Sequence, residues 1–380
     1  MKGRFFLNIG PLLGVLLLAC WLLPLQSLQA QGLSITEFMA RSDGSLLDED
    51  GWHSDWIEIY NGSSQTVNLK GWGLSDKPKS LFRWVFPNRF LLPGTRLVVF
   101  ASGRDRTPER GELHTNFKLS ADAGQFLALT NPQGVIVSQY SSYPEQFYGV
   151  SYGRENDSGR LRYFQNPSPG APNALGPRDG GPIFSDYSHS PALPERPEPG
   201  QPLTVEIRVE NGEFELEDIT LVWRLMWEPD ERIMMERVEE ETGALGAAPL
   251  YRATIDGSDF LPGQMLRWYI TASDVEGHQT HWPLHQSSLY SPVYFGTVIA
   301  AEPPETLLPV IELFPQVPGM IGSSSGSRCG VFFKGEFYDN VLSQVAGTTT
   351  RGFSKRSLHL SFPKDHKLLL FEGQPRYSDL

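Results

Sequence analysis

Apolar and polar residues alternate with a period of two along three stretches in the middle of this sequence. In the first, the apolar residues Leu203, Val205, Ile207 and Val209 are separated by polar or charged ones. The same pattern returns at Ile219, Leu221, Trp223, Leu225 and Trp227, and again at Leu266, Trp268, Ile270 and Ala272. Because successive side chains of a strand point to opposite faces, this period predicts strands with one buried and one wet face. Such strands, separated by turns, are typical of an antiparallel β-sandwich.

The high content of glycine and proline indicates the same fold class for the rest of the chain. The 380 residues include 37 glycines and 30 prolines, which suits many short strands and turns better than long helices. Hydrophobic residues make up 40% of the chain, enough to build cores. We therefore expect an all-β protein, and the length predicts two or three domains.

Two segments rich in proline and glycine divide the chain into three regions. The first joint begins at Asn166 and continues to Pro182, and the second covers residues 301–309. We define the first region as residues 31–176, the second as residues 177–300 and the third as residues 301–380. The first two are predicted to be β-sandwiches, and the third a partial β-rich region.

The first region shows strands that end at recognisable turns. Residues 55–60 form an apolar strand before the turn dipeptide Asn61-Gly62. Residues 125–129 and 135–137 flank Asn131-Pro132-Gln133-Gly134, which predicts a hairpin. In the second region, residues 231–241 contain good helix formers, but we interpret them as a strand plus a turn.

Residues 1–30 have the layout of a secretory signal peptide. Lys2 and Arg4 precede an apolar run over residues 9–25, and the small residue Ala30 marks the expected cleavage site. Two alternatives remain open: an uncleaved membrane anchor, and a lipoprotein site at Cys20. All three send the chain out of the cytoplasm, so we expect a secreted or cell-envelope protein with no membrane span after cleavage.

The third region offers few strands for its length. A flexible loop over residues 322–327 precedes two strand-like pieces, residues 331–333 and 358–362. These leave little material to close a core. We expect this region to be incomplete and partly disordered, or prone to aggregate.

Candidate metal ligands occur in two places. His278, His281 and His285 have a spacing that could place three imidazoles on one helical face, but Gly277 and Pro283 oppose a helix there, and a polar loop is the preferred interpretation. The acidic loop contains carboxylates dense enough for calcium, but its spacing does not fit an EF-hand, and a solvated insertion is preferred. Its residues are Asp43, Asp48, Glu49, Asp50 and Asp55.

Two further candidates concern phosphate binding and thiol chemistry. Lys355-Arg356 could line one wall of a nucleotide site, although a vestigial edge is the preferred interpretation. Cys329 adjoins Arg328, which could lower its pKa, but no histidine is near it in sequence. The sequence contains no Walker-type loop, nucleophile elbow or His-Glu-x-x-His motif. We therefore assign no catalytic, cofactor-binding or metal-binding residue, and expect no cofactor and no enzyme activity.

A series of motifs runs through the first region: Ile35-Thr36-Glu37-Phe38, Asp55-Trp56-Ile57-Glu58-Ile59-Tyr60-Asn61, Val67-Asn68-Leu69-Lys70-Gly71-Trp72-Gly73-Leu74-Ser75-Asp76, Trp84-Val85-Phe86-Pro87, Leu92-Pro93-Gly94, Ser151-Tyr152-Gly153-Arg154 and the segment 166–173. In these motifs the first region resembles the lamin tail domain as found in bacterial secreted proteins. The resemblance implies an immunoglobulin-like β-sandwich without enzyme activity. Trp56, Trp72 and Trp84 suit its core, and Gly71 and Gly73 suit a bend or a close backbone approach.

The third region contains Gly335-Glu336-Phe337-Tyr338-Asp339-Asn340, Gly347-Thr348-Thr349-Thr350, Phe353-Ser354-Lys355-Arg356-Ser357 and the predicted strand 358–362. In these residues it resembles the N-terminal edge of the CotH family of spore-coat kinase-like proteins. The family's catalytic carboxylates would lie beyond residue 380. The second region resembles the immunoglobulin- or fibronectin-like sandwich that often lies between these two domains in multidomain bacterial surface proteins.

Two functions follow as hypotheses. The first is an exported, non-catalytic binding or structural protein of the cell envelope or extracellular space, whose lamin-tail-like region interacts with an unknown protein or glycan. The alternative is the truncated N-terminal part of a secreted CotH-like atypical protein kinase. The net charge of −12 repels phosphate backbones, so no nucleic-acid partner is expected.

Overall fold

A computed structural model describes residues 32–380, except 43, 157, 174–179, 185–195, 240–247, 286–290, 303–304, 307, 348–355 and 372. These residues form strands and one short 3-10 helix, Pro318–Met320, which confirms the all-β prediction. No helix among them is long and apolar enough to cross a bilayer. The predicted signal peptide, with Cys20, lies outside the described residues.

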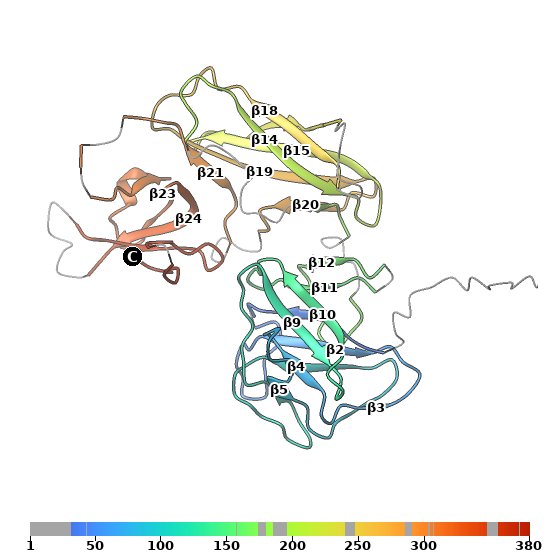
Figure 1. The fold of residues 1–380 in the computed structure, drawn as a ribbon. Coiled ribbons are helices and arrows are strands. Elements are labelled where there is room, and N and C mark those ends of the chain that lie inside the picture. Colours follow the sequence, from blue (N-terminus) through green and yellow to red (C-terminus); the bar gives the residue numbers. More distant parts are fainter. Residues whose placement is uncertain are drawn as a thin grey trace, which may run out of the picture.

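The first region is a sandwich of two sheets, seen in blue to green in Figure 1. One sheet has the order β12-β11-β1-β2-β7-β8 and the other β10-β9-β4-β5. The strands of the first are β12 (Leu161–Phe164), β11 (Ser151–Arg154), β1 (Leu33–Met39), β2 (Trp56–Asn61), β7 (Arg96–Phe100) and β8 (Leu113–His114). Those of the second are β10 (Ile136–Tyr143), β9 (Gln125–Thr130), β4 (Gly73–Ser75) and β5 (Trp84–Val85), and β3 (Val67–Asn68) pairs with β6 (Phe90–Leu91).

The predicted turns and anchors of this sandwich are present. The hairpin β9–β10 turns through Asn131 and Gly134, whose φ of 81° favours glycine. A Cβ on Gly73 would lie 2.6 Å from the carbonyl oxygen of Leu81, so the predicted close backbone approach is confirmed. Of the three tryptophans, Trp56 and Trp84 are buried and Trp72 is partly buried against the core.

The first joint is held against this sandwich. Glu37 on β1 is fully buried and accepts hydrogen bonds from the backbone N–H and the hydroxyl of Ser168, at 3.1 and 3.0 Å. Glu58 on β2 accepts one from the N–H of Gly170 at 2.7 Å. The side chain of Asn173 donates to the carbonyls of Thr36 and Arg154. Side chains of the sheet therefore fix the backbone of the first part of this joint, which includes the segment 166–173 quoted for the resemblance.

The second region is a second sandwich, which confirms the prediction from alternation. Its sheets have the orders β13-β14-β18-β17 and β16-β15-β19-β20, and β21 also pairs with β19. The strands are β13 (Ile183–Phe184), β14 (Leu203–Glu210), β18 (Leu250–Ile255), β17 (Glu236–Arg237), β16 (Glu231–Met234), β15 (Leu216–Leu225), β19 (Met265–Asp274), β20 (Gln279–Trp282) and β21 (Phe295–Val298). Of the segment 231–241, residues 231–234 and 236–237 are strands, which confirms the predicted strand, and residues 240–241 lie outside the described residues.

Two details of the alternation are wrong. β19 is buried on both faces, and Arg267, expected on the wet face, is only 1% exposed. The alternation of β15 stops at Met226, whose φ of 49° ends the extended backbone. Trp227 consequently leaves the sandwich core and packs with Met265, Phe332 and other residues of a separate cluster. Both departures occur where the third region packs against the second.

The third region forms a sheet of order β22-β23-β24-β25. Its strands are β22 (Glu312–Pro315), β23 (Ser327–Phe333), β24 (Glu336–Val345) and β25 (Leu358–Ser361). Its own core contains Cys329, Val331, Phe333, Tyr338, Val341, Leu360, Phe362 and Leu368. This finding differs from the expectation of an incomplete core. Residues after β25 contribute Leu368 to the core, and the backbone of Leu380 pairs with that of Leu360.

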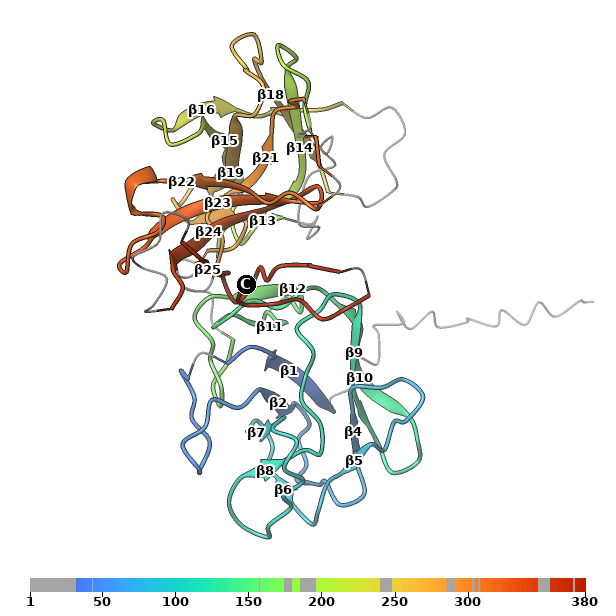
Figure 2. The ribbon, with the colours of Figure 1, turned by 90° about the vertical axis from the view of Figure 1, so that its left-hand side faces the viewer.

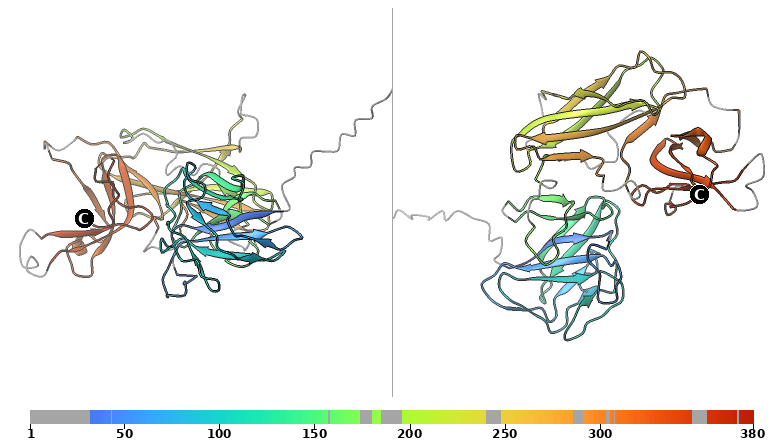
Figure 3. Two further views of the ribbon diagram at one scale, coloured as in Figure 1. Left: turned by 60° about the horizontal axis from the view of Figure 1, so that its bottom comes forward. Right: turned by 180° about the vertical axis from the view of Figure 1, so that it is seen from behind.

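The three regions pack together rather than forming a string. Figure 2 shows the third region between the second sandwich above and β12 of the first below, and the rear view in Figure 3 shows it beside the second sandwich. The ring of Phe147 in the first region lies 6.1 Å from Trp282 of the second, between centroids. Phe184 stacks on the same tryptophan at 6.0 Å. These contacts join the cores of the two sandwiches.

Candidate functional site

Glycines allow the second and third regions to approach closely. A Cβ on Gly330 of β23 would lie 2.5 Å from the sulfur of Met265, and one on Gly296 of β21 would lie 2.4 Å from the ring of Phe337. No side-chain carbon fits at such distances without a shift of the neighbours. The contact between the second and third regions therefore depends on glycine at both places.

Asp339 on β24 fixes this contact with hydrogen bonds. It is 2% exposed and accepts from the backbone N–H groups of Val293 and Tyr294, at 2.9 and 3.0 Å. Arg267 of β19 lies 3.4 Å from its other oxygen and donates to the carbonyl of Met226 at 2.6 Å. Burial lowers the pKa of Arg267, although the charge of Asp339 opposes this shift. The buried guanidinium of Arg267, on the second sandwich, is thus paired with the Asp339 carboxylate of the third region.

Asp365 joins all three regions. It is 6% exposed, and its carboxylate accepts from Arg41 (2.8 Å) and the backbone N–H of Tyr148 (2.9 Å), both in the first region. Its second oxygen accepts from the hydroxyl of Ser291 of the second region, at 2.9 Å. Burial raises the pKa of Asp365, and the nearby charge of Arg41 counteracts the rise. We call these four residues the Asp365 junction.

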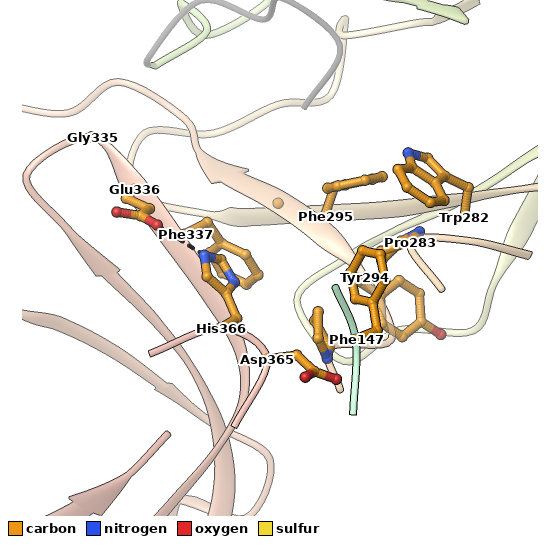
Figure 4. Close-up of a pocket in the computed structure, with 12 residues that line it drawn as sticks. Phe147, Trp282, Pro283, Tyr294, Phe295, Gly335, Glu336, Phe337, Asp365 and His366 are labelled. Atoms are coloured by element: carbon orange, nitrogen blue, oxygen red, sulfur yellow. Dashed lines mark hydrogen bonds and ion pairs between the residues drawn. The ribbon is translucent and has the colours of Figure 1, made fainter. Parts of the chain in front are cut away.

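A cavity of about 250 Å³ lies beside the Asp365 junction. Figure 4 shows its lining, with Trp282, Tyr294 and Phe147 on one side and His366, Phe337 and Glu336 on the other. Five aromatic side chains line it: Phe147 from the first region, Trp282, Tyr294 and Phe295 from the second, and Phe337 from the third. Binding sites commonly occur where domains meet and are mostly apolar with a few polar groups, so we take this cavity as the candidate site.

The polar residues at one end of the cavity are bonded to other parts of the protein. Glu336 accepts from Tyr338 (2.7 Å) and Arg376 (2.6 Å), and one of its oxygens lies 2.9 Å from the Nε2 of His366. Burial alone would raise the pKa of Glu336, but the hydrogen bond and charge of His366, followed by those of Arg376, lower it to about 2. Glu336 is therefore a fixed, ionised acceptor in a network of its own region.

A second, polar hollow of about 500 Å³ adjoins the cavity and shares Glu336, Asp365 and His366 with it. Arg41, Asp122, Glu145, Lys367 and Arg376 also line it. Burial raises the pKa of Glu145 to about 7, against the opposing charge of Arg41. The candidate site thus consists of the aromatic cavity and the polar hollow, and the paired carboxylates Glu336 and Asp365 line both of them.

The three candidate histidines do not form a metal site. His278 lies in the turn before β20, with its Nδ1 2.9 Å from Asp274 and its ring stacked on Phe214. His281 stacks on Tyr269 instead, and its ring is 6.3 Å from that of His285. Burial lowers the pKa of His281 to about 4. In the part of the chain that the structure describes, no three histidine, cysteine or acidic residues are grouped to hold a metal.

The acidic loop is organised by donors of the protein itself. Asp48 accepts from the backbone N–H groups of Asp50 and Trp52, at 3.1 and 3.0 Å, and from the hydroxyl of Ser54 at 2.6 Å. Arg104 pairs with Asp48 at 3.1 Å and also with Asp50. Asp55 lies beside the loop, and burial raises its pKa to about 7. Asp43 lies outside the described residues.

The remaining candidates are also structural where they are described. Lys355 lies outside the described residues, and Arg356 donates to the carbonyl of Gly322 at 2.9 Å. Cys329 is buried in the third region's core, and burial raises the pKa of its thiol to about 12 despite Arg328. The thiol therefore lacks the low pKa that adjacency to Arg328 could have given it.

Sequence reasoning missed the cavity and the Asp365 junction. The stretch 335–340, quoted for the CotH resemblance, does contain Glu336, Phe337 and Asp339. Nothing in the sequence, however, connects Phe147, Trp282 and Asp365, because they lie far apart and belong to three separate regions. Only the packing of these regions brings them together.

The fold defines a multidomain β-sandwich protein, and comparison with known proteins identifies part of it. Residues 26–144 match the family Lamin Tail Domain, which confirms the lamin-tail resemblance for that part of the chain. The structure adds β11 and β12 to the same sandwich beyond the match. No curated protein matches the chain.

One solved structure aligns over much of the chain but weakly. It is a purple acid phosphatase isolated from yellow lupin (Lupinus luteus) seeds, with 8% sequence identity and a TM-score of 0.26. The alignment covers 78% of this chain and 46% of the phosphatase, so the chain spans less than half of that protein. At this TM-score the likeness carries no functional argument.

Proposed function

We propose that this chain is an exported, non-catalytic binding protein of the cell envelope or extracellular space, and that its lamin-tail-like sandwich is the interaction module. The match of residues 26–144 to the lamin tail domain carries the proposal. The signal-peptide layout of residues 1–30 supports export. The buried carboxylates Asp339 and Asp365 are engaged in holding the regions together, which suits a binder with a fixed surface.

The acidic loop of the first region provides a surface for such an interaction. Trp52 is 64% exposed there, although Asp48 fixes its backbone and Arg104 lies 5.9 Å from its ring. A hollow of about 570 Å³ beside it is lined by Trp52, His53, Asp55, Arg106 and Lys118, among others. An exposed tryptophan on a rigid loop is a typical anchor for a partner.

Two measurements test the two parts of the proposal. Fractionation of cells expressing the tagged full chain should find it outside the cytoplasm, starting at Gln31, whereas lipid labelling at Cys20 would indicate the lipoprotein alternative. For binding, purified protein is incubated with isolated envelope of the source organism. Trp52→Ala should weaken retention at least tenfold, while Phe90→Ala, at an aromatic residue 60% exposed on β6, should not. Equal retention of both variants would refute the role of this loop.

The resemblance of the third region to the CotH family remains a separate proposal. The described residues 335–340 supply Asp339 to the contact with the second region, which is a structural role. The kinase-like interpretation predicts that the purified chain alone binds no ATP, whereas a longer gene product that includes the family's catalytic carboxylates binds it saturably. A longer product that also fails to bind ATP would refute this interpretation.

A further inference from the structure

The lining of the aromatic cavity in Figure 4 limits the charge and polarity of the ligands that can bind there. Its carboxylate and imidazole side chains are those of Glu336, Asp365 and His366, and each is bonded within the protein. Glu336 accepts from Tyr338 and Arg376, and Asp365 accepts from Arg41 and Ser291. A ligand therefore finds these polar groups already paired.

Charged ligands are disfavoured in either sign. A cation would compete with Arg41 for Asp365 and with Arg376 for Glu336, and so would weaken contacts that hold the regions. An anion would meet two carboxylates, Asp365 and Glu336, at the polar end. A sugar with many hydroxyls would leave several hydrogen bonds unmade, which costs about 1–3 kcal/mol for each group. The same paired network therefore disfavours all three classes of ligand.

The rest of the lining offers ring surfaces. Phe147, Trp282, Tyr294, Phe295 and Phe337 line the cavity, with Pro283 and Pro292 between them. The hydroxyl of Tyr294 is bonded to Asp230, at 3.1 Å, so this residue also contributes mainly its ring. Aromatic rings attract one another in stacked or edge-to-face arrangements beyond the effect of buried area. Apolar cavities of about 150 Å³ hold benzene, and this one, at about 250 Å³, has room for a larger ring compound.

We propose that this cavity binds one small uncharged ring compound, aromatic or alicyclic, through its apolar faces. This site is separate from the proposed binding of an envelope partner through the acidic loop. It lies between the regions and not on that loop. Because all three regions contribute to its wall, the bound compound also holds them together. A ligand that binds only this arrangement stabilises it in proportion to its concentration.

The test uses the purified full chain without residues 1–30 and four probes: toluene and indole as uncharged rings, benzoate and benzylamine as charged ones of similar size. Binding is followed by ligand-observed NMR and by the shift in the melting temperature. Saturable binding and a rise in melting temperature are expected for the first two only. Equal binding of benzoate or benzylamine, or non-saturable binding of toluene, would overturn the proposal.

Variants at Phe295 locate the site. Phe295→Trp adds bulk inside the cavity and should weaken indole binding at least tenfold, whereas Phe90→Trp on the exposed β6 strand should leave it unchanged. Phe295→Leu enlarges the cavity and should shift preference from toluene toward naphthalene. If Phe295→Trp does not fold, the Phe295→Leu result decides, since an unchanged preference places the binding elsewhere. Retention on envelope through Trp52 is measured on the same samples, so failure of one proposal is visible without the other.

Discussion

Replacing Asp365 with alanine is expected to release the first region from the other two. The carboxylate accepts from Arg41, from the N–H of Tyr148 and from Ser291, each at 2.8 or 2.9 Å. The substitution leaves all three donors without this acceptor. Removing one partner of a buried ion pair costs about 3–5 kcal/mol. Arg41 keeps 21% of its side chain exposed and regains water, so we expect the lower end, about 3 kcal/mol.

This loss should appear in the contacts between regions and spare the sandwiches themselves. We expect small-angle scattering to show a larger radius of gyration, and limited proteolysis to cut the Asp365→Ala protein between the first and second regions. Urea unfolding should separate into two transitions. The control is Glu206→Ala, which breaks an exposed pair with Arg252 inside the second sandwich and should cost less than about 1 kcal/mol. If both variants keep the wild-type radius and cleavage pattern, Asp365 does not hold the regions together.

Two further predictions concern the third region. The pKa of Glu336, about 2 against an ordinary 4.5, means that the folded state binds fewer protons, so this stabilisation is present above pH 4.5 and is lost as the pH falls toward 2. The stability of the third region should therefore depend less steeply on pH over that range in Glu336→Gln than in the wild-type protein. Equally steep pH profiles of the two proteins would contradict the assignment. Gly330→Ala should destabilise the contact between the second and third regions by about 1–3 kcal/mol through overpacking, measured by thermal unfolding. Gly319→Ala, where a Cβ meets nothing within 4 Å, should be neutral, and equal effects of the two would refute the close-approach argument.

The local elements could be predicted because their signals are local. Alternation located β14, and turn residues located the hairpin at Asn131 and Gly134. These signals depend on a strand's own side chains and on backbone angles that few residues tolerate. The lamin-tail motifs extended the prediction to a whole sandwich, and the match of residues 26–144 confirmed it.

The contacts between regions could not be predicted from the alternation of apolar and polar residues, because that pattern predicts a solvent-exposed outer face for each strand. Arg267 occupies such a position on β19, yet it is buried, and the third region supplies its partner Asp339. Likewise, nothing in the sequence before Trp227 indicates that Met226 takes a φ of 49°, at which the extended backbone of β15 ends. The candidate cavity could not be predicted from local patterns either, since its wall comes from three separate parts of the chain.

The Asp365 junction also sets an order of events during folding. Arg41 and Asp365 are 324 positions apart in the chain, so their contact forms only after nearly all of the protein has been synthesised. Chains fold from the N-terminus as they emerge, and contacts between distant residues are the slowest to form. Both sandwiches can therefore be complete before the third region packs against them. The aromatic cavity comes into existence at the last step, which makes it a feature of the finished molecule alone.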